Sequence, residues 1–254
     1  MTATLDLLDL ETKVKAMYRQ VAQEPHGAFH FELGEEVAIR VGYDADRLAA
    51  VPTGAVESFA GVGYFFDLAA LQAGETVVDL GSGSGMDAFY AAGFVGPTGQ
   101  VIGVDFSPEQ LAKARRLAKV GQVDFLEGRI EDLPLDDDSV DCVISNGVIN
   151  LCPDKKAVFA EAARVLRPGG RLAIADIISE QQFTESIVRD ADLWASCIGG
   201  AAQQDNYLNA IESAGFTVSL QRVNAYEFIS DRARSASAKY GVKSISLLAT
   251  KTTN

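Results

Sequence analysis

Short apolar runs alternate with helical patterns over most of the chain from about Gly74 onward. Five of these runs have the length and composition of buried strands, and they span residues 76–80, 100–105, 123–128, 140–145 and 171–177. The segments between them carry the apolar spacing and the start signals of helices. Strand and helix in steady alternation predict a parallel sheet with helices on both faces.

Two of the predicted helices have recognisable ends. Ser107 is expected to cap the helix after the second strand, with Pro108 at its first position and Gln110 completing a capping box. Asp154 is expected to open a later helix, and the Pro-Gly-Gly at 168–170 is expected to end it. Both helices then connect consecutive strands of the sheet.

The C-terminal part departs from this alternation. Residues 217–223 and 244–252 predict two closing strands around a helical segment at 231–241. Together with the five earlier runs they make seven strands. We therefore expect an α/β fold with a doubly wound, mostly parallel, seven-stranded sheet.

Two segments lie outside the sheet pattern. Residues 1–71 predict an N-terminal cap, helical at first and then loop-rich, ahead of a main domain at 72–254. Residues 178–204 form an insertion in that domain. Ligands of doubly wound sheets bind beyond the carboxyl ends of the strands, so the insertion is expected to build part of a substrate pocket. The cap is expected to close when ligand binds.

Composition narrows the possible partners. The chain has 254 residues, 48% of them hydrophobic, and a formal net charge of -13. No apolar run reaches the roughly 18–20 residues that span a bilayer, and the N-terminus lacks a basic start, so we expect a cytoplasmic protein without a membrane partner. An acidic surface repels phosphate and disfavours nucleic acid. Three cysteines and only two histidines, His26 and His30, argue against a disulfide framework and a metal site.

Three glycines at alternating positions follow the first strand in VVDLGSGSGMD, and they are Gly81, Gly83 and Gly85. Glycine permits a sharp turn and a close approach of the backbone to a ligand. Met86 stands where a dinucleotide fingerprint needs its third glycine, and the Gly-Lys-Ser/Thr of a phosphate loop is absent. The spacing, with Asp79 ahead of it, resembles the cofactor loop of class I S-adenosylmethionine methyltransferases. The resemblance implies a Rossmann-like fold, S-adenosylmethionine as cofactor and S-adenosylhomocysteine as its product.

Further positions match the cofactor site of that family. Asp105 ends the second strand 24 positions after Gly81, where an acid accepts hydrogen bonds from ribose hydroxyls, unless it only forms a turn. The resemblance implies that Ile130 and Glu131 flank adenine, unless they lie in a solvated acidic loop, and that Asp79 organises the methionine end. The implied cofactor-binding residues are Asp79, Gly81, Ser82, Gly83, Gly85, Asp105, Phe106, Ile130, Glu131 and Asn146.

A longer resemblance covers residues 41–215. VGYDADRLAAVPTGA, VGPTGQVIGVDFSPE and ISNGVINLCPDKKAVFAEAARVLRPGG look like the arsenite methyltransferases. Arsenite is soft and binds thiolates, and that family holds it with three cysteines. Here the first two of those positions hold Val62 and Gly147, and only the third keeps a cysteine, Cys197. The resemblance therefore carries over the fold and the cofactor but not the substrate.

The replacements predict a different acceptor site. Gly147 opens space at the tip of the fourth strand, and Tyr64, Phe65 and Trp194 add aromatic surface. With Cys197, these residues are expected to line a pocket for a small organic, partly apolar or aromatic molecule, although burial in the core is the alternative for each.

The other two cysteines do not restore the family's thiol set. Cys142 alternates inward within a strand and is expected in the core. Cys152 lies five residues beyond Gly147, past the strand tip, and is expected to point elsewhere unless the loop folds back.

Three functions stay open. The leading interpretation is methyl transfer from S-adenosylmethionine to a small organic acceptor. The second is an arsenite or metalloid methyltransferase that uses Cys197 and Cys152, and the third is a catalytically silent cofactor-binding regulator. A base is needed only if the acceptor must lose a proton, and the sequence singles out none. Tyr18 and Cys197 are the candidate catalytic residues.

Overall fold

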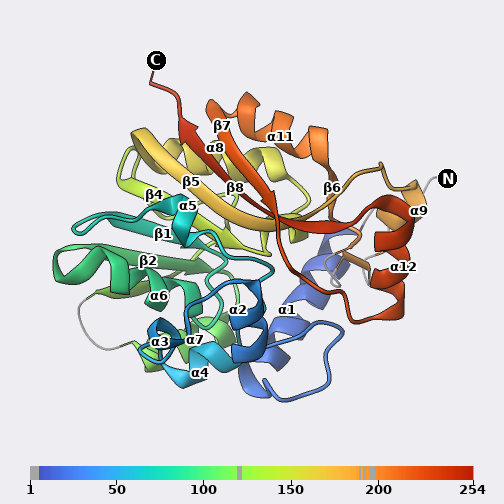
Figure 1. The fold of residues 1–254 in the computed structure, drawn as a ribbon, viewed down its shortest axis with the longest axis horizontal. Coiled ribbons are helices and arrows are strands. Elements are labelled where there is room, and N and C mark those ends of the chain that lie inside the picture. Colours follow the sequence, from blue (N-terminus) through green and yellow to red (C-terminus); the bar gives the residue numbers. More distant parts are fainter. Residues whose placement is uncertain (1–5, 119–121, 189, 191–192, 195–197, 254) are drawn as a thin grey trace.

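The computed structural model describes residues 6–118, 122–188, 190, 193–194 and 198–253. One sheet runs through it, with strand order β3-β2-β1-β4-β5-β8-β7 and a short β6 beside β5 (Figure 1). The strands are β1 (Thr76–Leu80), β2 (Gln100–Asp105), β3 (Val123–Glu127), β4 (Val140–Asn146), β5 (Leu166–Ser179), β6 (Ala202–Gln203), β7 (Phe216–Val223) and β8 (Lys243–Lys251). The first five pair in parallel, whereas β8 is antiparallel to both β5 and β7. The predicted doubly wound seven-stranded sheet is confirmed.

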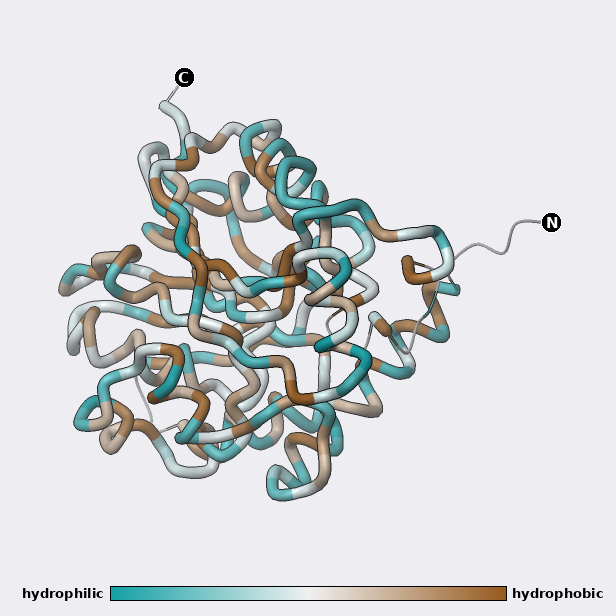
Figure 2. The backbone as a smooth tube through the Cα atoms, turned by 45° about the vertical axis from the view of Figure 1, so that its right-hand side comes forward, coloured by the Kyte–Doolittle hydropathy of each residue, from teal (hydrophilic) through white to brown (hydrophobic). Residues whose placement is uncertain are grey.

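Helices pack on both faces of this sheet. The connecting helices are α6 (Met86–Val95), α7 (Pro108–Leu117), α8 (Lys155–Val165), α11 (Gln204–Ser213) and α12 (Asp231–Tyr240), with short turns at η1 (Gly96–Thr98), η2 (Ile149–Leu151) and α9 (Glu185–Val188). Successive strand residues point to opposite faces, so Val77 packs in the core under α6 and α7 while Val78 packs in the core under α8 and α11. The hydrophobic stretches of the strands lie inside the molecule, and more hydrophilic stretches surround them (Figure 2).

The N-terminal segment adds five helices: α1 (Leu7–Gln23), α2 (Glu35–Val41), α3 (Ala45–Leu48), α4 (Thr53–Glu57) and α5 (Phe66–Ala69). Residues between Val37 and Leu71 share one hydrophobic core with α6 and the sheet. Helix α1 instead packs against α7 and joins a small separate cluster with Leu151 and Trp194. A division of the chain near residue 71 stays a prediction.

The capping box predicted at α7 does not form. Ser107 occupies the N-cap position, but its side chain makes no capping hydrogen bond, and its backbone N–H donates to Asp105 Oδ1 at 2.8 Å. Gln110 is instead drawn into tertiary contacts with Ser84 and the Tyr18 carbonyl. The other predicted start, Asp154, does cap α8, where its side chain accepts from the Ala157 N–H.

In the described ranges, no helix has both the length and the apolar character needed to cross a membrane.

Candidate active site

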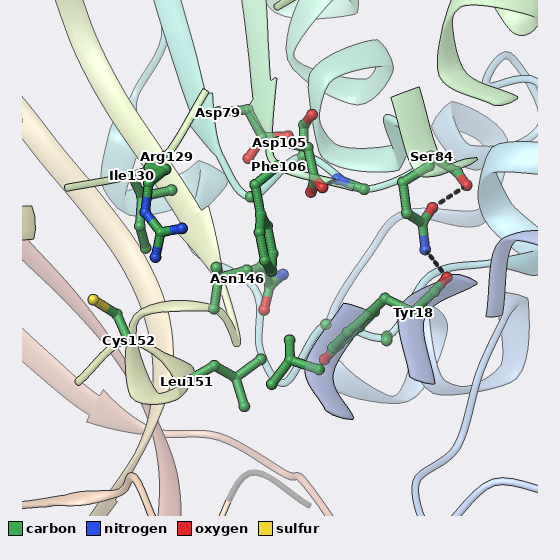
Figure 3. A pocket seen from close by; sticks show the side chains of 18 of the residues that line it. Tyr18, Asp79, Ser84, Asp105, Phe106, Arg129, Ile130, Asn146, Leu151 and Cys152 are labelled. Atoms are coloured by element: carbon green, nitrogen blue, oxygen red, sulfur yellow. Dashed lines mark hydrogen bonds between the residues drawn. The ribbon is translucent and has the colours of Figure 1, made fainter. Parts of the chain in front are cut away.

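A cavity of about 280 Å³ opens at the carboxyl ends of β1, β2 and β4. Its walls come from the loop between β1 and α6, the end of β2, residues 129–131, the tip of β4, residues 58–61 and the inner face of α1. Figure 3 shows Phe106 near the middle of the view, with Ile130 and Cys152 to one side and Tyr18 to the other. Nine of the ten predicted cofactor residues line this cavity, and the tenth, Gly85, begins α6 just behind the loop.

The loop after β1 can be built only from glycine at its turning points. Gly81, Gly83 and Gly85 have φ angles of 69°, 53° and 91°, which side-chain-bearing residues rarely adopt. A Cβ on Gly81 would lie 2.4 Å from Val148, and one on Gly85 would lie 2.5 Å from the Phe125 ring. The loop therefore passes close to its neighbours, and its glycines present bare backbone at this wall of the cavity.

Asp105 holds this loop from the end of β2. Its two carboxylate oxygens accept from the Gly83 N–H at 2.9 Å and the Ser107 N–H at 2.8 Å. Burial raises the pKa of Asp105, while the backbone N–H groups oppose that rise. The side chain both shapes the loop and lines the cavity, so the turn-forming role and the ribose-binding role proposed from the sequence are compatible.

Two buried polar atoms in this wall have no hydrogen-bond partner within the protein. They are Asp79 Oδ2 and Ser82 Oγ, and both side chains line the cavity. Burial and the neighbouring Asp87 and Asp105 carboxylates raise the pKa of Asp79 well above its usual range. Buried polar groups are normally satisfied, so these atoms indicate the place of a polar, and at Asp79 cationic, ligand group.

The opposite end of the cavity combines apolar faces with one carboxylate. Phe106 and Ile130 flank it, and Glu131 accepts a hydrogen bond from Cys152 Sγ at 3.0 Å. Arg129 lies 3.6 Å from the same Glu131 oxygen and donates to Glu11 of α1 at 2.9 Å. Burial and the Glu131 carboxylate raise the pKa of the Cys152 thiol above its usual range. Cys152 is therefore a protonated donor at this end, not a free thiolate.

Helix α1 closes one side of the cavity. Leu10, Val14 and Tyr18 face inward, and Gln110 Nε2 donates to the Tyr18 carbonyl at 2.8 Å (Figure 3). The same Gln110 amide accepts from Ser84 Oγ at 2.5 Å, so one side chain joins the glycine loop to α1. Nothing in the local sequence indicates this contact, because α1 and the loop are far apart along the chain.

These features fit S-adenosylmethionine. The cofactor carries an ammonium and a sulfonium, a ribose and an adenine, and the cavity offers a buried acidic end, the Asp105 carboxylate and an apolar slot ending in Glu131. Asp79 and Ser82 would hold the methionine end, Asp105 the ribose, and Phe106 with Ile130 and Glu131 the adenine. The roles assigned from the sequence stay predictions at the level of individual residues.

The two positions that the resemblance aligns with the first two cysteines of the arsenite methyltransferases lie side by side in the structure. A Cβ on Gly147 would lie 3.2 Å from Val62 Cγ1, and Val62 is 1% exposed. Here those neighbouring positions carry no sulfur. The third position, Cys197, lies outside the described residues.

Four residues expected in the substrate pocket do not line the cavity: Gly147 at the tip of β4 and three aromatic residues. Phe65 is fully buried in the core beside Phe66, and Tyr64 packs against Tyr43 in the same core. Trp194 is buried behind Leu151, where its indole N–H donates to the Val188 carbonyl. These aromatic side chains are held by packing and do not line the cavity. Sequence spacing could not distinguish this outcome, because a core and a pocket are both apolar.

Several cavity residues were missed by the sequence analysis. They include Asp87 and Arg129. Arg129 adjoins the predicted Ile130 and could have been found from its neighbour, whereas Asp87 offered no local signal. Cys152, expected to point elsewhere unless its loop folds back, does line the cavity, as does the candidate Tyr18 of α1. Cys142 behaves as expected, buried in β4 with its thiol pKa raised to about 12 by burial.

Comparison with known proteins agrees with this geometry. A family model described as a methyltransferase domain matches residues 71–215. The chain therefore belongs to the methyltransferase domain family, and it is a Rossmann-like methyltransferase domain of the class that uses S-adenosylmethionine.

Several similar proteins are arsenite methyltransferases. The chain is 46% identical over 197 residues to an arsenite methyltransferase of Halobacterium salinarum, covering 76% of this chain and 50% of that protein. It is 41% identical over 158 residues to an arsenite methyltransferase of Aquipseudomonas alcaligenes, covering 58% and 46%. A solved arsenic(III) S-adenosylmethionine methyltransferase from Chlamydomonas reinhardtii is 32% identical with a TM-score of 0.69, covering 82% of this chain and 72% of that one. The chain spans about half the length of the curated relatives it matches.

Proposed function

We propose that this chain transfers the methyl group of S-adenosylmethionine to a small, largely apolar organic acceptor. The cofactor half of the cavity matches the family. The remaining wall is built mainly from apolar side chains, namely Leu7, Leu10, Val14, Phe59, Ala60 and Leu151. Apolar walls with few polar groups suit small organic ligands.

The observation that supports the choice of acceptor is that Val62 and Gly147, which lie side by side, both lack a thiol. Thiolates at those positions would be needed to hold a soft metalloid ion, and the chain has none there. Cys152 does not replace them, because its Sγ donates to Glu131 at the adenine end and its pKa is raised. Arsenite is nevertheless the second candidate, favoured by the relatives at 46% and 41% identity.

In this reaction the protein would orient the cofactor and the acceptor and shield both from water. When bound, the cofactor supplies an electrophilic methyl group on a sulfonium. The glycine loop and Asp105 orient the cofactor, α1 covers it, and the apolar wall excludes water from the acceptor side. Tyr18 lines this wall, and we propose that its hydroxyl exchanges a proton with an acceptor hydroxyl.

The direct test supplies the full chain with methyl-labelled S-adenosylmethionine and a panel of small aromatic and aliphatic alcohols, amines and thiols. We expect label in an apolar acceptor, measured by mass spectrometry, and its loss in Asp105→Ala, which removes the carboxylate that holds the glycine loop. Cofactor binding with no labelled product across the panel supports the silent regulator instead. The cytoplasmic location and the absence of a nucleic-acid partner are kept as proposals.

A further inference from the structure

The side chain of Asn146, at the tip of β4, is saturated with hydrogen bonds. Its Nδ2 donates to the Tyr43 hydroxyl at 3.0 Å, to the Gly63 carbonyl at 3.0 Å and to Asp87 Oδ2 at 3.1 Å. Its Oδ1 accepts from the Val62 N–H at 2.7 Å and the Gly63 N–H at 3.3 Å. The amide that lines the cavity is thus committed to holding the 61–63 loop.

This loop approaches Asn146 more closely than a side chain would allow. A Cβ on Gly61 would lie 2.6 Å from Asn146 Nδ2, and one on Gly63 would lie 2.0 Å from Asn224 Nδ2. The far side of the loop is fixed as well, because Ser244 Oγ donates to the Val62 carbonyl and Ser246 Oγ donates to the Tyr64 carbonyl. Asn146 therefore sets where the wall formed by residues 59–61 stands relative to the cofactor.

Asp87 orients the Asn146 amide. It lies in the first turn of α6, lines the cavity, and accepts from both the Tyr43 hydroxyl and Asn146 Nδ2. Asp87 and Asp79 are both buried carboxylates, and the Asp87 charge is a cause of the raised pKa of Asp79. Burial raises the pKa of Asp87 itself to about 6. A cation in the acidic end of the cavity would favour the ionised form of both groups.

We propose that Asn146 is a positioning residue for the acceptor-side loop, and that Asp87 and Tyr43, through Asn146, tie the placement of that loop to occupancy of the cofactor end. The inference rests on the proposed function, since it assigns the 59–63 segment to the acceptor side. It also predicts an order of events. The cofactor binds first, its charge strengthens the hydrogen bonds from Tyr43 and Asn146 to Asp87, and the acceptor wall then becomes fixed.

Amide hydrogen exchange at Val62 and Gly63 measures this network directly, because both N–H groups donate to Asn146 Oδ1. S-adenosylhomocysteine is the probe, and no acceptor is needed. In the unchanged chain we expect the probe to slow exchange at these two amides. In Asn146→Ala we expect exchange to be about ten-fold faster, with a smaller change in affinity for the probe.

Asp87→Asn tests more specifically whether Asp87 links the cofactor end to the loop. It keeps the size of the side chain but removes its charge and leaves a single oxygen, so the Tyr43 hydroxyl and Asn146 Nδ2 can no longer each donate to a separate carboxylate oxygen. We expect it to abolish the probe-dependent slowing at Val62 and Gly63. Ser246→Ala is the matched control, since it loosens the same loop from β8 and should keep the slowing.

The possible outcomes separate the two proposals. Equal slowing in Asp87→Asn and in the unchanged chain overturns the network while leaving the methyltransferase proposal intact. Failure of the unchanged chain to bind the probe overturns both. Should Asp87→Asn not fold, Tyr43→Phe carries the same test with loss of one hydroxyl, and undiminished slowing there also overturns the network.

Discussion

At the scale of single residues, the acidic end of the cavity decides how the cofactor is held. Asp79 and Asp87 are buried near one another, with Asp105 close by and Tyr43 and Asn146 as hydrogen-bond donors to Asp87. Within the described residues, no protein cation is among the groups that shift the pKa of Asp79 or Asp87. Ionisation of these buried carboxylates is therefore unfavourable until a positively charged ligand binds.

This arrangement predicts a pH dependence. The pKa of Asp87 rises from 3.8 to about 6 on folding, so its contribution to the free energy of unfolding is present below about pH 4 and is lost as pH rises through about 6. Binding of S-adenosylhomocysteine, whose amine is a cation, should therefore strengthen between pH 5 and pH 7 by roughly ten-fold and release protons. Calorimetry in buffers of different ionisation enthalpy measures both effects.

The control for this prediction is an acid far from the cavity. Asp231→Asn removes an exposed carboxylate that pairs with Arg234 and should leave the pH profile unchanged, whereas Asp87→Asn should flatten it. Identical profiles for Asp87→Asn and the unchanged chain contradict the role given to Asp87.

At the scale of elements, the cavity-lining part of α1 packs outside the two main cores and would cover a bound cofactor. Its buried residues Leu10 and Val14 contact a small cluster outside the two main cores. Its ends are tied by exposed ion pairs, Arg129 with Glu11 and Arg19 with Glu109, which contribute little in water. A helix held this way can open without unfolding the sheet.

Leu10→Ala tests that account of α1. Leu10 is 2% exposed, and its truncation should speed amide exchange over residues 7–23 and weaken S-adenosylhomocysteine binding by roughly ten-fold, with little change in the unfolding midpoint of the sheet. Leu8→Ala is the matched control, because Leu8 on the same helix is 80% exposed. A large drop in the midpoint with unchanged affinity would mean that α1 is part of the main core.

The elements also show what a sequence can and cannot predict. Local patterns predict strands β1 to β5, the glycine loop and Asp105. The structure places the glycine loop and Asp105 together at the carboxyl ends of these strands. The link from Asn146 to Tyr43 spans 103 positions and that from Gln110 to Tyr18 spans 92, so no local pattern could indicate either. The failed capping box at Ser107 has the same cause, since Gln110 was recruited by a distant partner.

At the scale of the whole molecule, the cavity divides into a part that resembles the family and a part that departs from it. The end with Asp79, the glycine loop and Asp105 fits S-adenosylmethionine, and the chain belongs to the methyltransferase domain family. Next to the cavity-lining Gly61 and Asn146, Val62 and Gly147 occupy the two positions that the resemblance aligns with cysteines of the arsenite methyltransferases, and neither carries sulfur. We propose that the loss of these two thiols changes the acceptor while the cofactor stays the same.

A paired substitution makes that claim measurable. Val62→Cys with Gly147→Cys places two thiols in contact, and the smaller cysteine at 62 relieves the 3.2 Å approach that a Cβ at 147 would make to valine. Gly147 has a φ of 72°, so the variant should lose about 1–2 kcal/mol of stability. Both proteins should bind S-adenosylhomocysteine alike, which controls for folding.

The most direct measurement is the yield of methylated arsenic from methyl-labelled S-adenosylmethionine, arsenite and glutathione, compared between the unchanged chain and the Val62→Cys, Gly147→Cys variant. We expect no methylated arsenic from the unchanged chain and detectable product from the variant. Turnover of arsenite by the unchanged chain, lost in Cys197→Ser, would contradict this expectation and would identify arsenite as the acceptor.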